Sequence, residues 1–232
     1  PAANMADAGY VMGKKGERRM KDVELCLPIC VGTVSFWLGK KADEYHSHRW
    51  TVYVRSPVNE DLSPVVKKVV FHLHHSFDQP VREVLQQPFE LTETGWGEFE
   101  ITAVVHFVDE AAEEPFQMVH GLKLFHTNDQ PLTTKKPVVN ESYEELVFSE
   151  PTEVLYNRVV PVNSKPAPET SLLPHLPQHS DAPEFAKISA AREKVASLVA
   201  AIKQETPGGG ADAAAANATA AMGAQPQVKV EN

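Results

Sequence analysis

Residues 23–127 consist of short apolar segments separated by turn-forming residues, and this pattern limits the possible folds more than any other feature of the sequence. In His48–Arg55, Trp50, Val52 and Val54 share one face and the intervening residues share the other, which is the two-residue period of a β-strand. Comparable segments are Val23–Leu38, Val65–His74, Phe89–Thr92, Phe99–Val108 and Phe116–Phe125. Because about six to eight such strands occur without a long amphipathic helix between them, the sequence predicts an all-β fold, an immunoglobulin-like antiparallel β-sandwich.

The residues beyond this region are mixed in character. Val138–Val139 and Leu146–Phe148 are candidates for a final strand that closes the sandwich. Pro151–Val160 is typical of a short helix, since a proline suits the first helical turn. Within the first strand, Pro28 fits best at a sheet edge or at a bulge, because proline cannot donate a ladder hydrogen bond.

The composition shifts along the chain and divides it into five parts. Residues 1–21 contain a small basic cluster and are expected to form a flexible leader. Residues 22–160 hold the sandwich. Residues 161–180 contain many prolines and are expected to form an extended linker. Residues 181–205 are predicted to be a helix, and residues 206–232, rich in alanine and glycine, are predicted to be a disordered tail.

The helix predicted at 181–205 resembles a short coiled coil. Asp181 followed by Glu184 is a capping-box pattern. The apolar residues then recur at steps of three and four, close to the spacing of a coiled-coil seam: Phe185, Ile188, Ala191, Val195, Leu198 and Ile202. We prefer a helix that binds a partner to one that folds back on the sandwich, because the proline-rich linker separates the two.

The chain is acidic, since its 232 residues include 22 Lys and Arg against 31 Asp and Glu and carry a formal net charge of −9. This argues against direct non-specific binding of DNA, which needs a positive surface. The longest apolar run without a charge, Leu25–Gly39, is shorter than the roughly 20 residues that cross a bilayer. We therefore expect no direct DNA contact and no membrane span, and the first residues do not form a secretory signal pattern.

The two cysteines, Cys26 and Cys30, lie four residues apart in a predicted strand, so their Cα atoms would be roughly 13 Å apart. A disulfide requires less than about 7 Å. We therefore expect two buried, unpaired thiols, which indicate a reducing compartment such as the cytosol or the nucleus.

The sequence shows no pattern for enzymatic chemistry. It contains no G-x-S-x-G nucleophile motif and no glycine-rich phosphate loop between a strand and a helix. The acids of residues 110–114 and 141–150 are interpreted as solvated runs that attract basic partners. The pairs His46–His48 and His72–His74 have the spacing of metal ligands, but zinc needs further ligands that the sequence does not place nearby. We expect no catalytic residue, no metal and no cofactor.

Aromatic residues at loop positions indicate a groove instead. Trp96 lies between Gly95 and Gly97, and glycines let the backbone come close to another group. Phe77 follows one predicted strand and Phe99 begins another. These aromatics are expected to line a groove at one end of the sandwich; the alternative is that Trp96 merely covers the end of the sheet.

Longer segments around these residues make the chain resemble the YEATS-domain family. They are VVFHLHHSF at 69–77, PFELTETGWGEF at 88–99 and LKLF at 122–125, and HSHRWTVYV at 46–54 fits the start of the family pattern. The GWGEF form looks most like the branch found in chromatin-remodelling, histone-acetyltransferase and TFIID-type complexes. The resemblance implies an immunoglobulin-fold reader of acetylated or crotonylated lysine on histone tails.

Matching motif positions imply roles for single residues. Phe77 and Trp96 would flank the acyl-lysine, the Ser76 hydroxyl would hydrogen-bond the acyl amide, and the Trp96 backbone N–H would hold the acyl carbonyl. The remaining residues that the resemblance places in the groove are His46, His74, Gly95, Gly97, Phe99 and His120.

The resemblance also implies a setting for the protein. It would be a nuclear, non-enzymatic subunit whose partners are the acylated histone H3 tail and, through the C-terminal helix, other subunits of such a complex. The net charge of −9 would attract a basic histone tail. Two alternatives remain: a scaffold subunit that acts through its helix with a vestigial groove, and a histidine-rich metalloenzyme.

Overall fold

The computed structural model describes residues 9–126, 131–160, 165–180 and 182–205. One unit spans residues 8–179 and a second contains the C-terminal helix, and each is described by itself. The predicted disordered tail and the predicted helix cap Asp181 lie outside the described residues. None of the helices among these residues combines the length and the apolar character that crossing a membrane requires.

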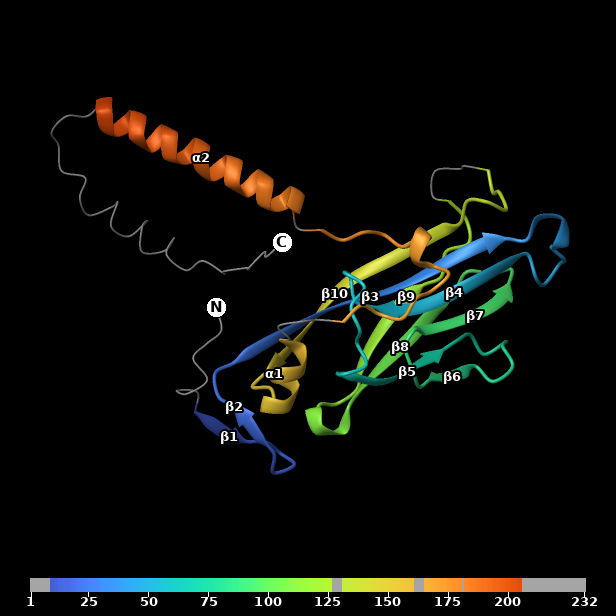
Figure 1. Cartoon of the computed structure of the whole chain (residues 1–232). Helices are drawn as coiled ribbons and strands as arrows, with labels where there is room; N and C mark the ends of the chain where they lie inside the picture. The colour runs from blue at the N-terminus through green and yellow to red at the C-terminus, as the bar shows by residue number, and fades with distance from the viewer. Residues whose placement is uncertain (1–8, 127–130, 161–164, 181, 206–232) are drawn as a thin grey trace. The chain divides into compact units, whose positions relative to one another are not determined.

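Two four-stranded antiparallel sheets face each other in the first unit (Figure 1). The first sheet has the order β10-β3-β4-β7, with β3 at Glu24–Trp37, β4 at His48–Arg55, β7 at Phe89–Gly95 and β10 at Val138–Ser149. The second has the order β6-β5-β8-β9, with β5 at Val66–His72, β6 at Val81–Val84, β8 at Glu100–Phe107 and β9 at Phe116–Gly121. The predicted antiparallel sandwich is therefore confirmed.

The core lies between the two sheets and follows from the alternation along each strand. Trp50 and Val52 of β4 point inward and are fully buried, as are Phe71 of β5 and Ile101 of β8. Burial of such side chains stabilises the fold by roughly 1.5–3 kcal/mol each. The alternation that predicted the strands is thus also what places these side chains in the core.

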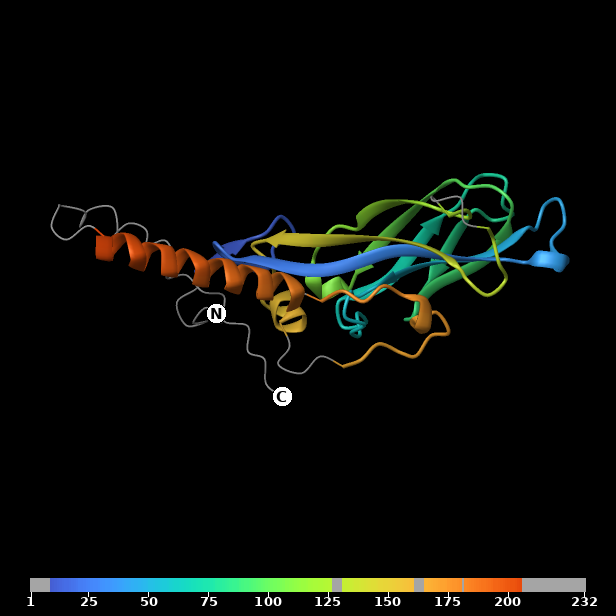
Figure 2. The ribbon, with the colours of Figure 1, turned by 90° about the horizontal axis from the view of Figure 1, so that it is seen from above.

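β3 and β10 are long strands that run side by side (Figure 2), and their pairing extends from Glu24 opposite Ser149 to Ser35 opposite Val138. The two apolar patches expected in the final strand belong to this one strand, β10. β4 pairs with β3 only from Cys30 onward. Pro28 therefore lies where β3 has a neighbour on one side only, which agrees with the edge position that its missing N–H predicts.

The N-terminal segment forms a hairpin instead of a flexible leader. β1 (Tyr10–Met12) pairs with β2 (Arg18–Met20), and Met20 is buried. The Arg19 guanidinium donates to the carboxylate of Glu113 at 2.8 Å. The expectation of a flexible leader is wrong for the residues of this hairpin, because its basic residues form ion pairs with the acids that follow β8.

The proline-rich segment also differs from the extended linker that we expected. Residues 165–179, which we call the strap, lie along the outer face of the first sheet. Leu172 and Leu176 are buried there and form a small apolar cluster with Val34 and Tyr53. A short 3-10 turn, Leu173–His175, lies between them. Leucines spaced four apart within the prolines are the signal that we did not use.

A buried ion pair lies beneath the end of the strap. The Arg55 guanidinium binds the Glu141 carboxylate at 2.8 and 2.9 Å, and the Tyr53 hydroxyl donates to the same group at 2.7 Å. Arg55 also donates to the Pro177 carbonyl of the strap at 2.7 Å. Interpreting the acids of 141–150 as solvated is therefore wrong for Glu141, whose side chain is 2% exposed.

Both cysteines lie on β3 and are unpaired, as predicted. Cys30 is buried, and its burial together with the nearby negative charge of Glu141 raises the pKa of its thiol to about 12. Cys26 is exposed, so the expectation that both thiols are buried is wrong for this residue. The strap covers the outer face of β3 at Cys30, and Cys26 lies beyond it.

The described residues also form two α-helices. α1 (Glu153–Val159) confirms the short helix expected after Pro151, and the Thr152 hydroxyl caps it by accepting the Leu155 N–H at 3.2 Å. α2 (Ala182–Glu205) confirms the C-terminal helix. A further 3-10 turn, Asp109–Ala111, follows β8, and another, Gly39–Lys41, follows β3.

Candidate functional site

Three loops meet at one end of the sandwich because their strands pair there. β4 begins at His48, which pairs with Gly95 at the end of β7, so the loop before β4 lies beside the loop after β7. β5 ends at His72, which pairs with Thr102 near the start of β8. The loop after β5 therefore lies beside residues 96–99, which lead into β8.

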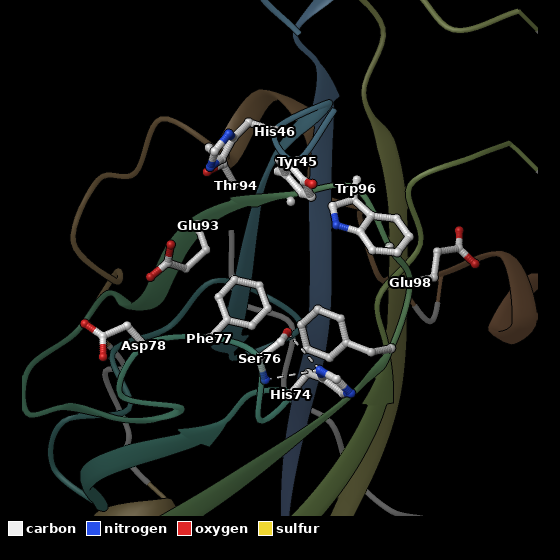
Figure 3. Close-up of a pocket in the computed structure, with 13 residues that line it drawn as sticks. Tyr45, His46, His74, Ser76, Phe77, Asp78, Glu93, Thr94, Trp96 and Glu98 are labelled. Carbon is white, nitrogen blue, oxygen red and sulfur yellow. Dashed lines mark hydrogen bonds between the residues drawn. The ribbon is translucent and has the colours of Figure 1, made fainter. Parts of the chain in front are cut away.

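These loops enclose a cavity of about 650 Å³, which Figure 3 shows in close-up. Tyr45, His46 and Trp96 lie on one side of it, and His74 and Ser76 lie on the opposite side (Figure 3). The residues predicted from the sequence that line this cavity are His46, His74, Ser76, Phe77, Gly95, Trp96, Gly97 and Phe99. The structure thus brings together residues that are up to 53 positions apart in the chain, from His46 to Phe99.

Two of the cavity aromatics are anchored on the core. The buried Trp50 ring meets Phe77 and Phe99 edge-on, with ring centroids 5.8 and 5.7 Å apart. The ring centroids of Phe77 and Phe99 lie 5.5 Å apart. Trp96 is 62% exposed. The wall formed by Phe77 and Phe99 is therefore fixed by packing on the core, and the wall formed by Trp96 is exposed to solvent.

Gly95 lies where space is short. A Cβ at this position would lie 3.4 Å from Trp50 Nε1 and 3.8 Å from Phe77 Cζ. A Cβ at Gly97 would have no described atom within 4 Å. The close approach expected at these glycines is thus present at Gly95, and Gly97 faces open space.

Ser76 is oriented by His74. The Ser76 backbone N–H donates to Nδ1 of His74 at 3.3 Å, and the Ser76 Oγ lies 2.9 Å from the same nitrogen (Figure 3). In either tautomer of the imidazole, the Ser76 oxygen keeps at least one lone pair that His74 does not use. That lone pair is available to accept a hydrogen bond from a ligand N–H.

The loop that carries His46 is held by Asp43. His46 Nδ1 lies 2.9 Å from the Asp43 carboxylate, and the His46 backbone N–H donates to the same group at 2.7 Å. Hydrogen bonds from the backbone N–H of Tyr45 and from His46 hold the pKa of Asp43 below its usual value. An ionised Asp43 therefore fixes the position of His46 at the mouth of the cavity.

Glu98 holds another segment of the cavity lining in place, as Asp43 holds His46. Its carboxylate accepts the Leu124 N–H at 2.8 Å and binds the Lys123 ammonium at 3.1 Å. Burial works against its ionisation, but these hydrogen bonds hold the pKa of Glu98 below its usual value. Glu98 thereby ties residues 96–99 to the segment that follows β9.

His120 does not line the cavity, contrary to our expectation. The alternation of β9 places Met118 and His120 between the sheets, and His120 is 2% exposed. Its Nε2 lies 3.4 Å from the hydroxyl of Thr33 and 3.4 Å from the side-chain amide of Asn140. Its burial lowers the pKa of the imidazole. We therefore remove His120 from the candidate site.

Five further residues line the cavity and were not predicted: Tyr45, Asp78, Glu93, Thr94 and Glu98. Four of the five adjoin a predicted residue in the sequence, and Glu93 lies two positions before Gly95. Tyr45, Asp78 and Glu98 lie in loops, where side chains do not alternate between two faces, so neighbours of a site residue can face the same space. Glu93 and Thr94 lie at the end of β7, next to the predicted Gly95. This adjacency is the signal that could have found them.

Metal-ligating side chains come together at another place. Within the described residues, Cys30, Glu141 and His179 have ligand atoms within 4.8 Å of one another, and this group contains neither histidine pair from the sequence analysis. The Glu141 carboxylate already binds Arg55 and Tyr53 and lies 2.6 Å from His179 Nε2. A cation here would compete with the Arg55 guanidinium, so this geometry does not favour a metal.

Comparison with known families matches residues 45–126 to the YEATS family. The chain is 53% identical over 144 residues to transcription initiation factor TFIID subunit 14b of Arabidopsis thaliana, a match of 62% of this chain and 54% of that protein. It is 36% identical over 208 residues to the protein AF-9 homolog of Saccharomyces cerevisiae, a match of 81% of this chain and 92% of that protein. The chain thus spans about half of the first relative and most of the second.

Two solved structures resemble the sandwich. The Yaf9 YEATS domain bound to H3K27ac is 40% identical, with a TM-score of 0.54 over 60% of this chain and 96% of that one. The Yaf9 YEATS domain recognizing an H3K122suc peptide is also 40% identical, with a TM-score of 0.51 over 61% of this chain and 96% of that one.

Proposed function

The chain belongs to the YEATS family, and from this we propose that it is a reader subunit that binds acyl-lysine of the histone H3 tail in the cavity at the loop end of its sandwich. The observation that carries this proposal is the cavity of about 650 Å³ whose walls are Phe77, Phe99 and Trp96 and whose rim includes the Ser76 hydroxyl. Relatives of the same family bind acylated H3 peptides.

The chemistry of these walls suits an acylated lysine. Acylation replaces the ammonium by a flat amide with an apolar tail, and aromatic faces pack well against such a group. We assign Phe77 and Trp96 to the two sides of the amide. The fixed position of Phe77 on Trp50 and the exposure of Trp96 leave a slot that is open to a side chain from solvent.

The amide also needs hydrogen-bond partners, because a desolvated and unpaired amide is costly. Ser76 Oγ, which is held 2.9 Å from His74 Nδ1, is placed to accept the amide N–H. The Trp96 backbone N–H is assigned to the acyl carbonyl. An unmodified lysine would still gain cation–π energy from the aromatics, so the discrimination depends on these two hydrogen bonds and on desolvation.

The wider setting is inferred from the relatives, one of which is a subunit of the transcription initiation factor TFIID. We infer a nuclear, non-enzymatic subunit, and a second role for α2 as the element that joins it to other subunits. The specific observation in favour of that role is the apolar side chains of α2, which are half exposed or more at Ile188, Val195 and Leu198.

Calorimetric titration of the full chain with an H3 tail peptide in unmodified, acetylated and crotonylated forms tests the reader function. We expect the acylated forms to bind at least tenfold more tightly than the unmodified one. Trp96→Ala should lose this binding with little change in melting temperature, because the side chain is 62% exposed. A folded protein that binds no form would overturn the proposal and favour a scaffold subunit with a vestigial groove.

A further inference from the structure

The apolar seam of α2 follows a strict heptad pattern. From Ile188 onward the apolar residues recur at steps of three, four, three and four, which assigns them to alternating a and d positions. This α2 seam consists of Ile188, Ala191, Val195, Leu198 and Ile202. Its large members are half exposed or more in the described chain, from 50% at Ile188 to 62% at Ile202. β-branched residues at a with leucine at d favour a two-stranded coiled coil.

Cations occupy both margins of the seam. With Ile188 at position a, Lys187 and Lys194 fall at position g and Arg192 falls at position e. The acidic Glu193 falls at position f, on the opposite face of the helix. Glu184, at the start of the seam, binds the Lys187 ammonium at 2.7 Å. The chain as a whole carries a net charge of −9, so these positive margins are a local feature of α2.

This arrangement opposes pairing of α2 with a second copy of itself. In a parallel pair, the residue at g faces the residue at e that lies five positions further on in the other helix. Lys187 would then face the Arg192 of a second copy, and like charges in such positions repel. The seam spans only about two heptads, and a helix pair of that length is marginal without favourable flanking charges.

We propose that α2 pairs with an acidic amphipathic helix of a different protein, whose glutamates or aspartates lie beside Lys187, Arg192 and Lys194, and that it does not pair with itself. The proposal rests on the assembly role of α2 given above and adds the chemistry of the partner. Charges at e and g positions are what selects partners in coiled coils.

Two designed helical probes of about four heptads each test this proposal. Both carry Ile at a and Leu at d, one has Glu at every e and g position, and the other has Lys there. We expect the full chain to bind the Glu probe at least tenfold more tightly than the Lys probe in fluorescence anisotropy. The preference should shrink when the salt concentration rises from about 0.05 M to about 0.5 M, because exposed charges are screened.

Variants of the full chain sharpen the test. Lys187→Glu with Arg192→Glu and Lys194→Glu should reverse the preference between the probes. The control, Ser189→Glu with Ala190→Glu and Ser197→Glu, places the same number of acids away from the seam and should leave the preference unchanged. Val195→Asp should abolish binding of both probes, since it puts a charge into the seam, and should leave binding of an acetylated H3 peptide intact.

Equal affinity for the two probes, or a stable dimer of the full chain in sedimentation, would overturn the proposed partner chemistry while leaving the assembly role of α2 in place. Failure to bind either probe, together with unchanged co-purification of other subunits by the Val195→Asp variant, would overturn both. The reader function is tested separately, by measuring binding of the H3 peptide to the same samples.

Discussion

Single residues of this chain are placed by partners that are near in the sequence for some and far away for others. Ser76 owes the direction of its hydroxyl to His74, and Phe77 owes its position to the buried Trp50. The buried Glu141 carboxylate is neutralised by the Arg55 guanidinium and accepts a hydrogen bond from the Tyr53 hydroxyl. Hydrogen bonds and the nearby positive charge outweigh desolvation and hold the pKa of Glu141 below its usual value.

Replacing Glu141 by glutamine tests the buried pair. Glu141→Gln leaves the Arg55 guanidinium buried without a counter-charge, and breaking a buried ion pair in this way costs roughly 3–5 kcal/mol. The exposed neighbour on the same strand gives the control, Glu144→Gln, which should change the free energy of unfolding by less than about 0.5 kcal/mol. Denaturant titration of both variants measures the difference, and equal stabilities would show that the pair contributes nothing.

At the scale of elements, the strap is not part of either sheet of the sandwich, but it packs against the first one. It covers the outer face of β3 and β4 through Leu172 and Leu176, and it is fastened at its end by Arg55 and His179. β4 is therefore buried on both faces, by the core on one side and by the strap on the other. A proline-rich composition predicts an extended chain, but it does not exclude docking of that chain.

The strap offers a matched pair of substitutions. Leu176→Ala removes a side chain that is 7% exposed and should lower the free energy of unfolding by about 2–3 kcal/mol. Leu173→Ala, in the same turn, removes one that is 37% exposed and should cost less than about 1 kcal/mol. Denaturant unfolding of both variants decides the point. Two variants as stable as the unmodified chain would mean that the strap does not dock in solution.

At the scale of the whole molecule, two buried imidazoles make folding sensitive to acid. His48 of β4 and His120 of β9 are 1% and 2% exposed, and burial lowers the pKa of both. Each stays neutral in the folded protein at a pH where the unfolded chain binds a proton. The free energy of unfolding is therefore highest above about pH 6.5, the usual pKa of a histidine in an unfolded chain. It decreases as the pH falls below that value, because the unfolded chain then binds protons that the folded protein does not.

Denaturant midpoints at pH 7.5 and pH 5.5 measure this effect. We expect the free energy of unfolding to fall with pH by at most about 1.4 kcal/mol per pH unit for each of the two histidines. His120→Gln should reduce this pH dependence, because it removes one of the two buried imidazoles. A pH dependence that is unchanged in His120→Gln would show that this imidazole titrates alike in both states.

The candidate site was largely visible in the sequence, because the resemblance fixed eight of its residues by motif position and the loops brought in their neighbours. His120 was misplaced because strand alternation, which decides whether a side chain points inward, depends on where β9 begins and pairs. The hairpin and the strap were missed because basic and proline-rich compositions are also typical of unfolded segments, and what orders them here are contacts with Glu113 and Tyr53.

The sequence by itself determined the two-residue alternation, and with it the strands, the core and the all-β class, because that period is a property of neighbouring residues. It also determined the heptad seam of α2 for the same reason. Only the tertiary structure decided that Arg55 meets Glu141 and that the strap lies over β4. Those pairs join positions far apart in the chain, and their meeting depends on how the strands are ordered in the two sheets.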